Sequence, residues 1–312
     1  MSDPSPAQSL ADRLAATAAG SVRVVLLYGS QLSGARPDRH SAFDFVVIVH
    51  DYGAFHRALA DAHELHRPVW LMSALAGVLP PNTMAFAPDA GHLGIAKCLV
   101  VSGEHFARGL GPAAPDHFFV GRMVQRVRTL WSASPADEHW VEQRLGESRA
   151  GVLTWMLPYL DEPVDAAGLG RRLLEVCYQG ELRPEAADRA HRIFDTQVEH
   201  FRAIFPPVLE AGVVSGSLAR EGERFRPAQP ASPALRRRWA RYFRRSKTRA
   251  TLRWFKHMVT FANWLPYVVQ KVERHTGRNI ELTRLEKALP IIFLWPRAIH
   301  VLLTRPRREI PR

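Results

Sequence analysis

Two short stretches of the chain hold residues whose types could do chemistry on a phosphate. The pair Gly29–Ser30 ends an apolar run over residues 22–28, and one acid, Asp44, stands in a second apolar run over residues 43–50. Glycine lets a backbone approach a phosphate closely, and the N–H groups after it can donate to it. A carboxylate in a buried strand is costly unless it is paired or binds a metal. These residues predict a nucleotidyltransferase site, with a nucleoside triphosphate on the turn and Mg²⁺ on Asp44.

A metal site of this kind usually has two acids separated by one residue. Asp44 aligns with the later of the two, and the earlier position is Ala42, which cannot ligate a metal. We therefore expect Asp51, just past the strand, or Glu181 to complete the magnesium site. Lys97 stands within another apolar run, where a buried amine needs a partner such as phosphate. The alternative for Lys97 is a strand-edge position from which the amine reaches water.

These residues need a sheet to position them, and the pattern predicts an α/β fold. Strands are predicted over residues 22–28, 43–50, 84–86 and 93–101, because these runs are short, apolar and rich in β-branched residues. From residue 118 to about 205 the pattern favours helices throughout, beginning with one over 118–131. The predicted division is a nucleotidyltransferase-fold domain with a mixed β-sheet over 1–115, a helical domain over 116–220, a linker over 221–234 and a basic helical segment over 235–312.

The composition is that of an ordinary globular protein, with 46% hydrophobic and 23% charged residues among 312. The two cysteines, Cys98 and Cys177, stand in apolar runs and predict reduced core residues, not a disulfide or a zinc site. The first 20 residues contain acids early and no continuous apolar core, so they do not have the pattern of a secretory signal. These features favour a cytoplasmic protein.

The basic charge is concentrated near the C-terminus. The net charge is +12, and residues 236–312 contain 20 Lys or Arg against 4 Asp or Glu, interleaved with aromatic residues. This composition is typical of a segment that lies on an anionic membrane surface. The apolar run over 288–303 is short and interrupted by proline and charge, so we expect it to lie on the membrane, or to pack on the protein, but not to cross the bilayer.

Taken in chain order, several motifs resemble those of the Tam41-type mitochondrial phosphatidate cytidylyltransferases and their bacterial relatives. In that family a YGS turn is followed by a strand with a single acid in an apolar frame, so Ala42 agrees with the resemblance. The resemblance covers nearly the whole chain in order and is carried by Tyr28-Gly29-Ser30, Phe43-Asp44-Phe45, Lys97–Ser102, Gly121-Arg122, Tyr178–Arg183, His200-Phe201-Arg202 and Ser246–Lys256.

The resemblance implies that CTP and phosphatidic acid give CDP-diacylglycerol and pyrophosphate, with Mg²⁺, on the inner face of a membrane. Nucleic acid is then not expected as a partner, and no oligomeric state follows from the sequence. The implied catalytic residues are Asp44, Ser30 and Lys97; the implied CTP-binding residues are Tyr28, Gly29, Ser30, Lys97 and Arg122; the implied metal ligands are Asp44, Asp51 and Glu181; and the implied lipid-binding residues are Lys247, Arg249, Arg253 and Lys256.

Two other functions remain open at this stage. One is a nucleotidyltransferase that acts on nucleic acid, in which the basic segment would grip phosphates. The other is a non-catalytic protein that binds a lipid surface on a nucleotidyltransferase fold, and Ala42 is its best support.

Overall fold

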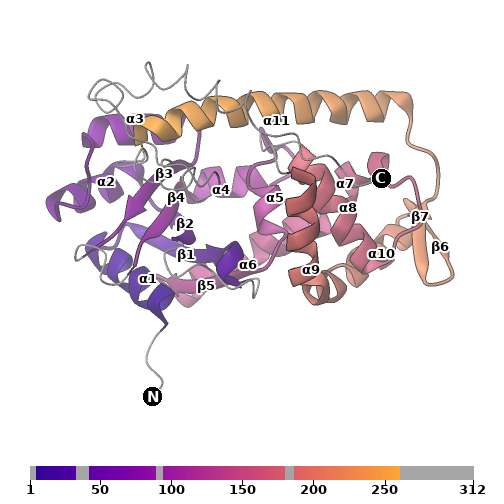
Figure 1. Cartoon of the computed structure of the whole chain (residues 1–312), viewed down its shortest axis with the longest axis horizontal. Helices are drawn as coiled ribbons and strands as arrows, with labels where there is room; N and C mark the ends of the chain where they lie inside the picture. Colours follow the sequence, from indigo (N-terminus) through magenta and orange to yellow (C-terminus); the bar gives the residue numbers. More distant parts are fainter. Residues whose placement is uncertain (1–4, 33–41, 89–93, 180–185, 261–312) are drawn as a thin grey trace, which may run out of the picture. The chain divides into compact units, whose positions relative to one another are not determined.

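A five-stranded sheet is the centre of the part of the chain that carries the candidate site (Figure 1). The computed structural model describes residues 5–32, 42–88, 94–179 and 186–260. The strand order is β3-β4-β2-β1-β5, in which β2 and β4 are parallel and the other neighbouring pairs are antiparallel. The α/β class with a mixed sheet is therefore confirmed. The strands are β1 (Val22–Tyr28), β2 (Phe43–Val49), β3 (Asn82–Phe86), β4 (Ala96–Ser102) and β5 (Val127–Ser132).

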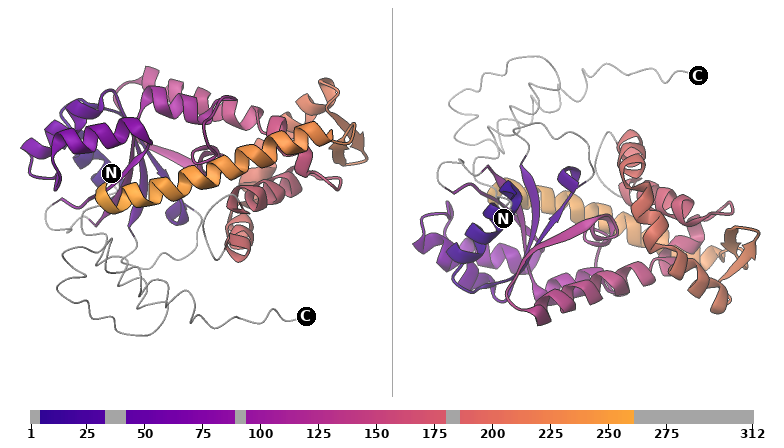
Figure 2. Two further views of the ribbon diagram at one scale, coloured as in Figure 1. Left: turned by 90° about the horizontal axis from the view of Figure 1, so that it is seen from above. Right: turned by 90° about the horizontal axis from the view of Figure 1, so that it is seen from below.

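The two faces of the sheet bury different sets of side chains, because successive residues of a strand point to opposite faces. Leu27 and Phe45 lie in a cluster with α1 (Pro6–Thr17) and α2 (Tyr52–Asp61). Leu26 and Val46 lie on the other face, in a larger cluster with residues of the helical region. Figure 2 shows the sheet from above and from below. Residues of the predicted domains 1–115 and 116–220 thus share one hydrophobic core.

Polar residues begin several of the helices by accepting backbone hydrogen bonds. Ser5 accepts from the Gln8 N–H at the start of α1, and Asp51 accepts from the Ala54 N–H at the start of α2. Ser102 accepts from the His105 N–H and begins α4 (Gly103–Leu110). The other helices before the basic segment are α3 (Val69–Val78), α5 (Val120–Met123), α6 (Pro135–Ala150), α7 (Leu153–Met156), α8 (Ala166–Gln179), α9 (Ala186–Ile204) and α10 (Pro206–Val214), with short 3₁₀ turns η1 (Ser30–Leu32) and η3 (Leu157–Tyr159).

Two sequence predictions about secondary structure are wrong. The helix expected over residues 118–131 is replaced by the short α5 and by β5, which pairs with β1 at the edge of the sheet. The linker expected over residues 221–234 contains most of a hairpin, formed by β6 (Leu218–Glu221) and β7 (Arg224–Pro227). Phe225 on β7 is buried and exchanges backbone hydrogen bonds with Val164, so this segment belongs to the core.

The basic segment begins as one long helix, α11 (Pro233–Thr260), that belongs to the same compact unit as the sheet. Near its start Phe243 packs on Trp155 and Tyr159, and at its end the Thr260 hydroxyl donates to the Thr83 carbonyl of edge strand β3, 2.9 Å away. Figure 1 shows α11 running from near the β6–β7 hairpin to α3. Residues 261–312, including the apolar run over 288–303, lie outside the described residues.

Two further expectations can be compared with the described residues. Cys98 and Cys177 are buried and carry free thiols, as predicted. None of the helices in the described part of the chain combines the length and the apolar character that crossing a bilayer requires.

Candidate active site

Three of the predicted site residues stand side by side across the sheet. Asp44 on β2 pairs in register with Tyr28 on β1 and, on its other side, with Lys97 on β4. Directly paired residues of neighbouring strands share a face and lie about 5 Å apart. The next row on that face is Leu26, Val46 and Leu99, which belong to the large core cluster. The Tyr28–Asp44–Lys97 row is therefore the partly exposed polar end of an otherwise apolar face.

The glycine–serine turn touches the Asp44 carboxylate. Gly29 has φ +86°, a backbone conformation that residues with a Cβ rarely adopt. A Cβ added there would lie 2.9 Å from Asp44 Oδ2, so only glycine leaves room for this approach. Ser30 follows as an exposed residue and begins η1. The two motifs that the sequence separates by about 15 residues thus form one site.

The helical layer adds basic and aromatic side chains. Arg122 on α5 donates to the Phe118 carbonyl at 2.8 Å, and its guanidinium carbon lies 3.9 Å from the centroid of the Phe118 ring. The Arg253 guanidinium of α11 lies 4.4 Å from the same centroid. We call the region around Phe118, Arg122 and Arg253 the basic corner. Two cations lie on one ring there, which makes the corner strongly positive and suits a ligand with phosphate groups.

The assignment of Asp51 as a metal ligand beside Asp44 is incompatible with the strand geometry. Asp51 follows the far end of β2, roughly 20 Å from Asp44 along a strand that rises about 3.3 Å per residue. Its carboxylate accepts the Ala54 N–H at 2.8 Å and caps α2. Its role in the structure is to begin a helix, so it cannot share a metal ion with Asp44.

The magnesium ion that the sequence implies fits the Asp44 end of β2. Glu181, the other expected ligand, lies outside the described residues, and within those residues no group of three or more His, Cys, Asp or Glu side chains could hold a metal. Magnesium commonly takes one or two carboxylates and fills its other positions with water and substrate phosphates. The Asp44 carboxylate, which lies against the turn at Gly29, has the oxygen chemistry that such a site needs.

Of the four residues expected to bind lipid, three point into the protein. Arg253 has only 2% of its surface exposed, and its Nη2 donates to Asp116 Oδ2 at 2.7 Å. Arg249 donates to the same oxygen at 2.7 Å. Lys256 is buried and donates to the carbonyls of Leu75, Leu79 and Pro81. Arg253 and Lys256 thus cannot reach a membrane surface in this structure, whereas Lys247 is exposed.

The electrostatics of this corner follow from burial and from the crowding of cations. Burial opposes ionisation of Asp116, but Arg253 and Arg249 hold the pKa of its carboxyl below the usual value. Burial and the Arg253 guanidinium lower the pKa of the Lys256 amine to about 7. Burial and the cations Lys256, Lys97, Arg253 and Arg122 lower the pKa of His257 to about 2.

His257 is a residue of this corner that the sequence analysis does not single out. The available signal is its spacing, because Ser246, Arg253, His257 and Thr260 follow one another at seven, four and three residues, which places them on one side of a helix. His56, by contrast, is not part of this site: it is fully buried in α2, and its Nδ1 lies 3.1 Å from the Ser73 hydroxyl.

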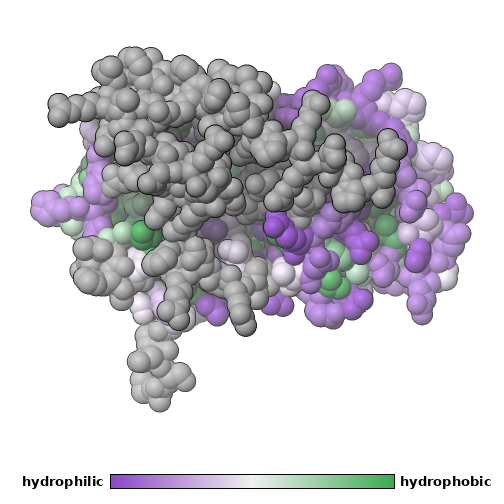
Figure 3. Space-filling model, in the orientation of Figure 1, coloured by the Kyte–Doolittle hydropathy of each residue, from purple (hydrophilic) through white to green (hydrophobic). Residues whose placement is uncertain are grey.

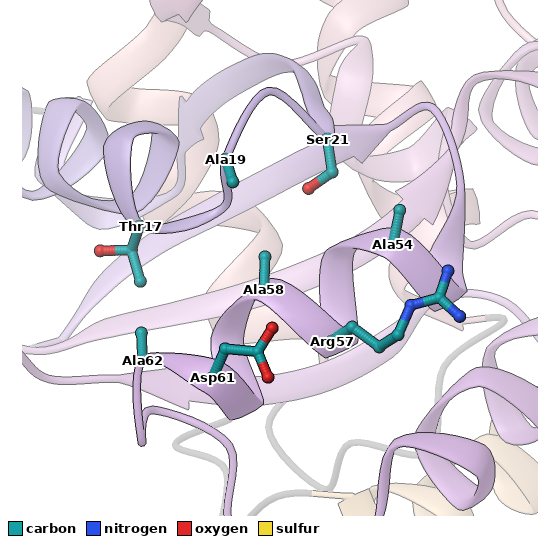
Figure 4. A pocket seen from close by; sticks show the side chains of 8 residues that line it. All are labelled: Thr17, Ala19, Ser21, Ala54, Arg57, Ala58, Asp61 and Ala62. Carbon is teal, nitrogen blue, oxygen red and sulfur yellow. The ribbon is translucent and has the colours of Figure 1, made fainter.

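A shallow pocket on the surface lies away from this site (Figure 4). Ser21, which lines it, precedes β1, whereas Tyr28 ends that strand; Ala54, another lining residue, follows the Asp51 end of β2. Its lining is mostly small side chains together with Arg57 and Asp61. The pocket therefore contributes nothing to the row that contains Asp44.

Comparison with models of known protein families finds no match for this chain, and comparison with curated proteins finds none either.

Proposed function

We propose that this protein is a nucleotidyltransferase that transfers CMP from CTP to phosphatidic acid, giving CDP-diacylglycerol and pyrophosphate. One observation carries the proposal: the Gly29 turn, which only glycine can form, lies against the Asp44 carboxylate, and Lys97 stands beside Asp44 on the next strand. A phosphate-binding turn, a carboxylate and a cation at one end of a sheet are what transfer at a phosphorus atom requires. The nucleotidyltransferase fold is part of this proposal.

Each residue of the row would have a defined task. The backbone after Gly29 and the Ser30 hydroxyl would donate to the triphosphate of CTP, and Lys97 would balance its charge. Asp44 would hold Mg²⁺, which supplies electrostatic stabilisation of charge that develops on the phosphate oxygens. Tyr28 would border the nucleotide from the end of β1. The lipid phosphate would attack the α-phosphorus in line with the departing pyrophosphate.

The outer side of α11 offers a surface on which the enzyme would meet its lipid. Arg237, Arg241, Arg244 and Lys247 are all exposed there, in agreement with an anionic membrane as partner. Lys247 is part of this proposed membrane surface, whereas Arg253 and Lys256 are not, because both are buried. The cytoplasmic, peripheral location is part of the same proposal.

Exposed apolar side chains accompany this basic surface. Trp254 and Leu252 on α11 are 53% and 55% exposed, and Trp70 and Val78 on α3 are 71% and 78% exposed. The two helices are joined by Lys256, whose amine donates to the Leu75 carbonyl of α3. In the view of Figure 3 the surface over α9, α10 and the β6–β7 hairpin is mainly hydrophilic instead. Aromatic and aliphatic side chains beside arginines favour a membrane interface.

The proposed reaction is tested by one assay of the purified full chain. Each of the four nucleoside triphosphates is offered with liposomes that contain or lack phosphatidic acid, and pyrophosphate release is measured with Mg²⁺ and with a chelator. We expect release only with CTP, phosphatidic acid and Mg²⁺ together. Release that needs RNA in place of liposomes would instead support a nucleic-acid substrate, and liposome binding without release from any nucleotide would support a non-catalytic protein.

A further inference from the structure

The inner side of α11 is polar, and most of its polar groups have partners in the described residues. The Ser246 hydroxyl accepts the His117 N–H at 3.0 Å, Arg253 Nε donates to the Pro80 carbonyl at 3.0 Å, and the Lys256 amine donates to the Pro81 carbonyl at 2.8 Å. These bonds fix the rotation of α11 about its axis. The side chains between them are therefore held in place and are not free to turn to solvent.

Three buried nitrogen atoms of α11 are exceptions, and the first, Trp239 Nε1, lies near the start of the helix. Arg253 Nη1 and His257 Nε2 are shielded from solvent and have no hydrogen-bond partner within the described part of the chain. A buried donor without a partner is unfavourable, and more so when the group is charged. Arg253 and His257 are one helical turn apart, so they lie on the same side of α11. Two of the three unsatisfied atoms therefore belong to neighbouring side chains at the β3 end of α11.

The surroundings of these atoms are cationic. Arg253 shares Asp116 Oδ2 with Arg249, so one carboxylate serves two guanidinium groups. Lys97 and Arg122 lie close enough to His257 to lower its pKa, together with burial and with Arg253 and Lys256 of α11 itself. Positive charges gathered in a partly buried corner repel one another, and a bound anion would relieve that repulsion.

The same corner adjoins the row that contains Asp44, because Lys97 belongs to both. Lys97 pairs in register with Asp44 on one side and with Ala85 of β3 on the other, and β3 is the strand whose Thr83 carbonyl binds Thr260 of α11. A group bound between α11 and Lys97 would therefore lie next to a ligand held by the Gly29 turn.

We propose that Arg253 and His257 of α11, together with Lys97 of β4 and Arg122 of α5, bind a phosphate group of the substrate. The chemistry fits a phosphate monoester or the end of a polyphosphate, since its oxygens accept from the guanidinium and from the imidazole N–H. The assignment rests on the proposed function in that it places this phosphate beside the CTP site. It makes α11 a part of the substrate-binding site as well as a support of the fold.

Binding calorimetry on the full chain tests the proposal without measuring catalysis. The probes are Mg²⁺–CTP, a short-chain soluble phosphatidic acid and inorganic phosphate. The central variant is His257→Leu, which removes a buried nitrogen without a partner and so keeps the protein folded. His257→Gln restores a donor, and Arg245→Met removes an exposed cation of the same helix. Thermal unfolding of each variant accompanies the titrations.

We expect His257→Leu to weaken binding of at least one phosphate-bearing probe by about tenfold, which is the size of one lost hydrogen bond to a charged group. His257→Gln should recover most of that loss, and Arg245→Met should bind as the wild type does. A loss confined to the lipid assigns the site to the lipid phosphate, and a loss confined to CTP assigns it to the triphosphate.

The proposal is overturned if folded His257→Leu binds all three probes as tightly as the wild type. It is also overturned if His257→Gln binds as weakly as His257→Leu, since the donor would then be irrelevant. Failure of the proposed reaction looks different: binding would depend on His257 as described, yet CTP and phosphatidic acid would release no pyrophosphate.

Discussion

At one end of β2, Asp44 lies against the Gly29 turn and in register with Lys97, whereas at the other end Asp51 accepts the Ala54 N–H and begins α2. In the sequence the two acids look alike, since both adjoin the same apolar run. In the structure the Asp44 carboxylate lies against Gly29, where any residue with a Cβ would clash with it. The Asp51 carboxylate instead accepts an N–H at the start of α2. The difference teaches that the neighbours of an acid across the sheet, not its place along the strand, decide whether it has catalytic potential.

The largest expected difference between the two ends is in activity. Asp44→Asn keeps the size of the side chain but removes its charge, so several kcal/mol of transition-state stabilisation would be lost. We expect pyrophosphate release from CTP with phosphatidic acid to fall on the order of 100-fold, while the midpoint of unfolding stays as in the wild type. Retained activity in a folded Asp44→Asn variant would contradict the assignment.

Two glycines provide a matched test of the contact between the Gly29 turn and Asp44. Gly29 and Gly20 both have positive φ, +86° and +77°, but a Cβ at Gly20 would meet nothing within 4 Å. We expect each change to alanine to cost about 1–2 kcal/mol of unfolding free energy from backbone strain. Gly29→Ala would in addition push on the Asp44 carboxylate and lose activity, whereas Gly20→Ala would remain active.

Denaturant unfolding and the CTP assay on both alanine variants make this comparison. Equal loss of activity in the two would show that strain alone, and not the contact with Asp44, is responsible.

At the Asp51 end of β2 we expect a contribution to the unfolding free energy that depends on pH. Burial lowers the pKa of His56, which follows Asp51 in α2, from 6.5 to about 4. Between these values the unfolded chain binds a proton that the folded chain does not, so unfolding free energy falls as pH decreases, by about 1.4 kcal/mol per pH unit. His56→Gln cannot titrate and should show a smaller slope in urea unfolding measured from pH 7 to pH 4. An unchanged slope would mean that His56 is protonated in the folded protein.

The smallest effect is expected from Asp51 itself. Asp51→Ala removes the cap of α2 and should cost about 1 kcal/mol, whereas Asp51→Asn should cost almost nothing, because asparagine caps equally well. Neither variant should change the rate of pyrophosphate release. A large loss of activity in Asp51→Asn would return Asp51 to the metal site and remove the contrast between the two ends of β2.

The sequence predicts the Asp44 end of the molecule well because its signals are local. β1 begins and ends where the apolar run does, β2 ends one residue before its run, and the positive φ of Gly29 agrees with the turn expected there. The sequence does not predict β5, because Val127–Ser132 is short and follows a helical pattern, and its strand character depends on pairing with β1.

The position of α11 could not be predicted, because it depends on contacts with residues far away in the chain, such as Asp116 and Thr83. The run of arginines in that segment suggests a charged surface, yet Arg253 is buried by Asp116 and Phe118, which the local pattern does not reveal. The sequence does not say whether a charged side chain of a helix faces solvent or the protein interior until its partner is known. His257 lies on the same buried side of α11, which the local pattern does not reveal either.

The central claim is that Asp44 binds the metal that accompanies CTP, and calorimetric titration of CTP with and without Mg²⁺ tests it most directly. The titration is done on the wild type, Asp44→Asn and Asp51→Asn. The account predicts that Mg²⁺ strengthens CTP binding equally in the wild type and in Asp51→Asn, and that Asp44→Asn loses this strengthening. An Asp44→Asn variant whose CTP affinity still rises with Mg²⁺ as in the wild type would contradict it.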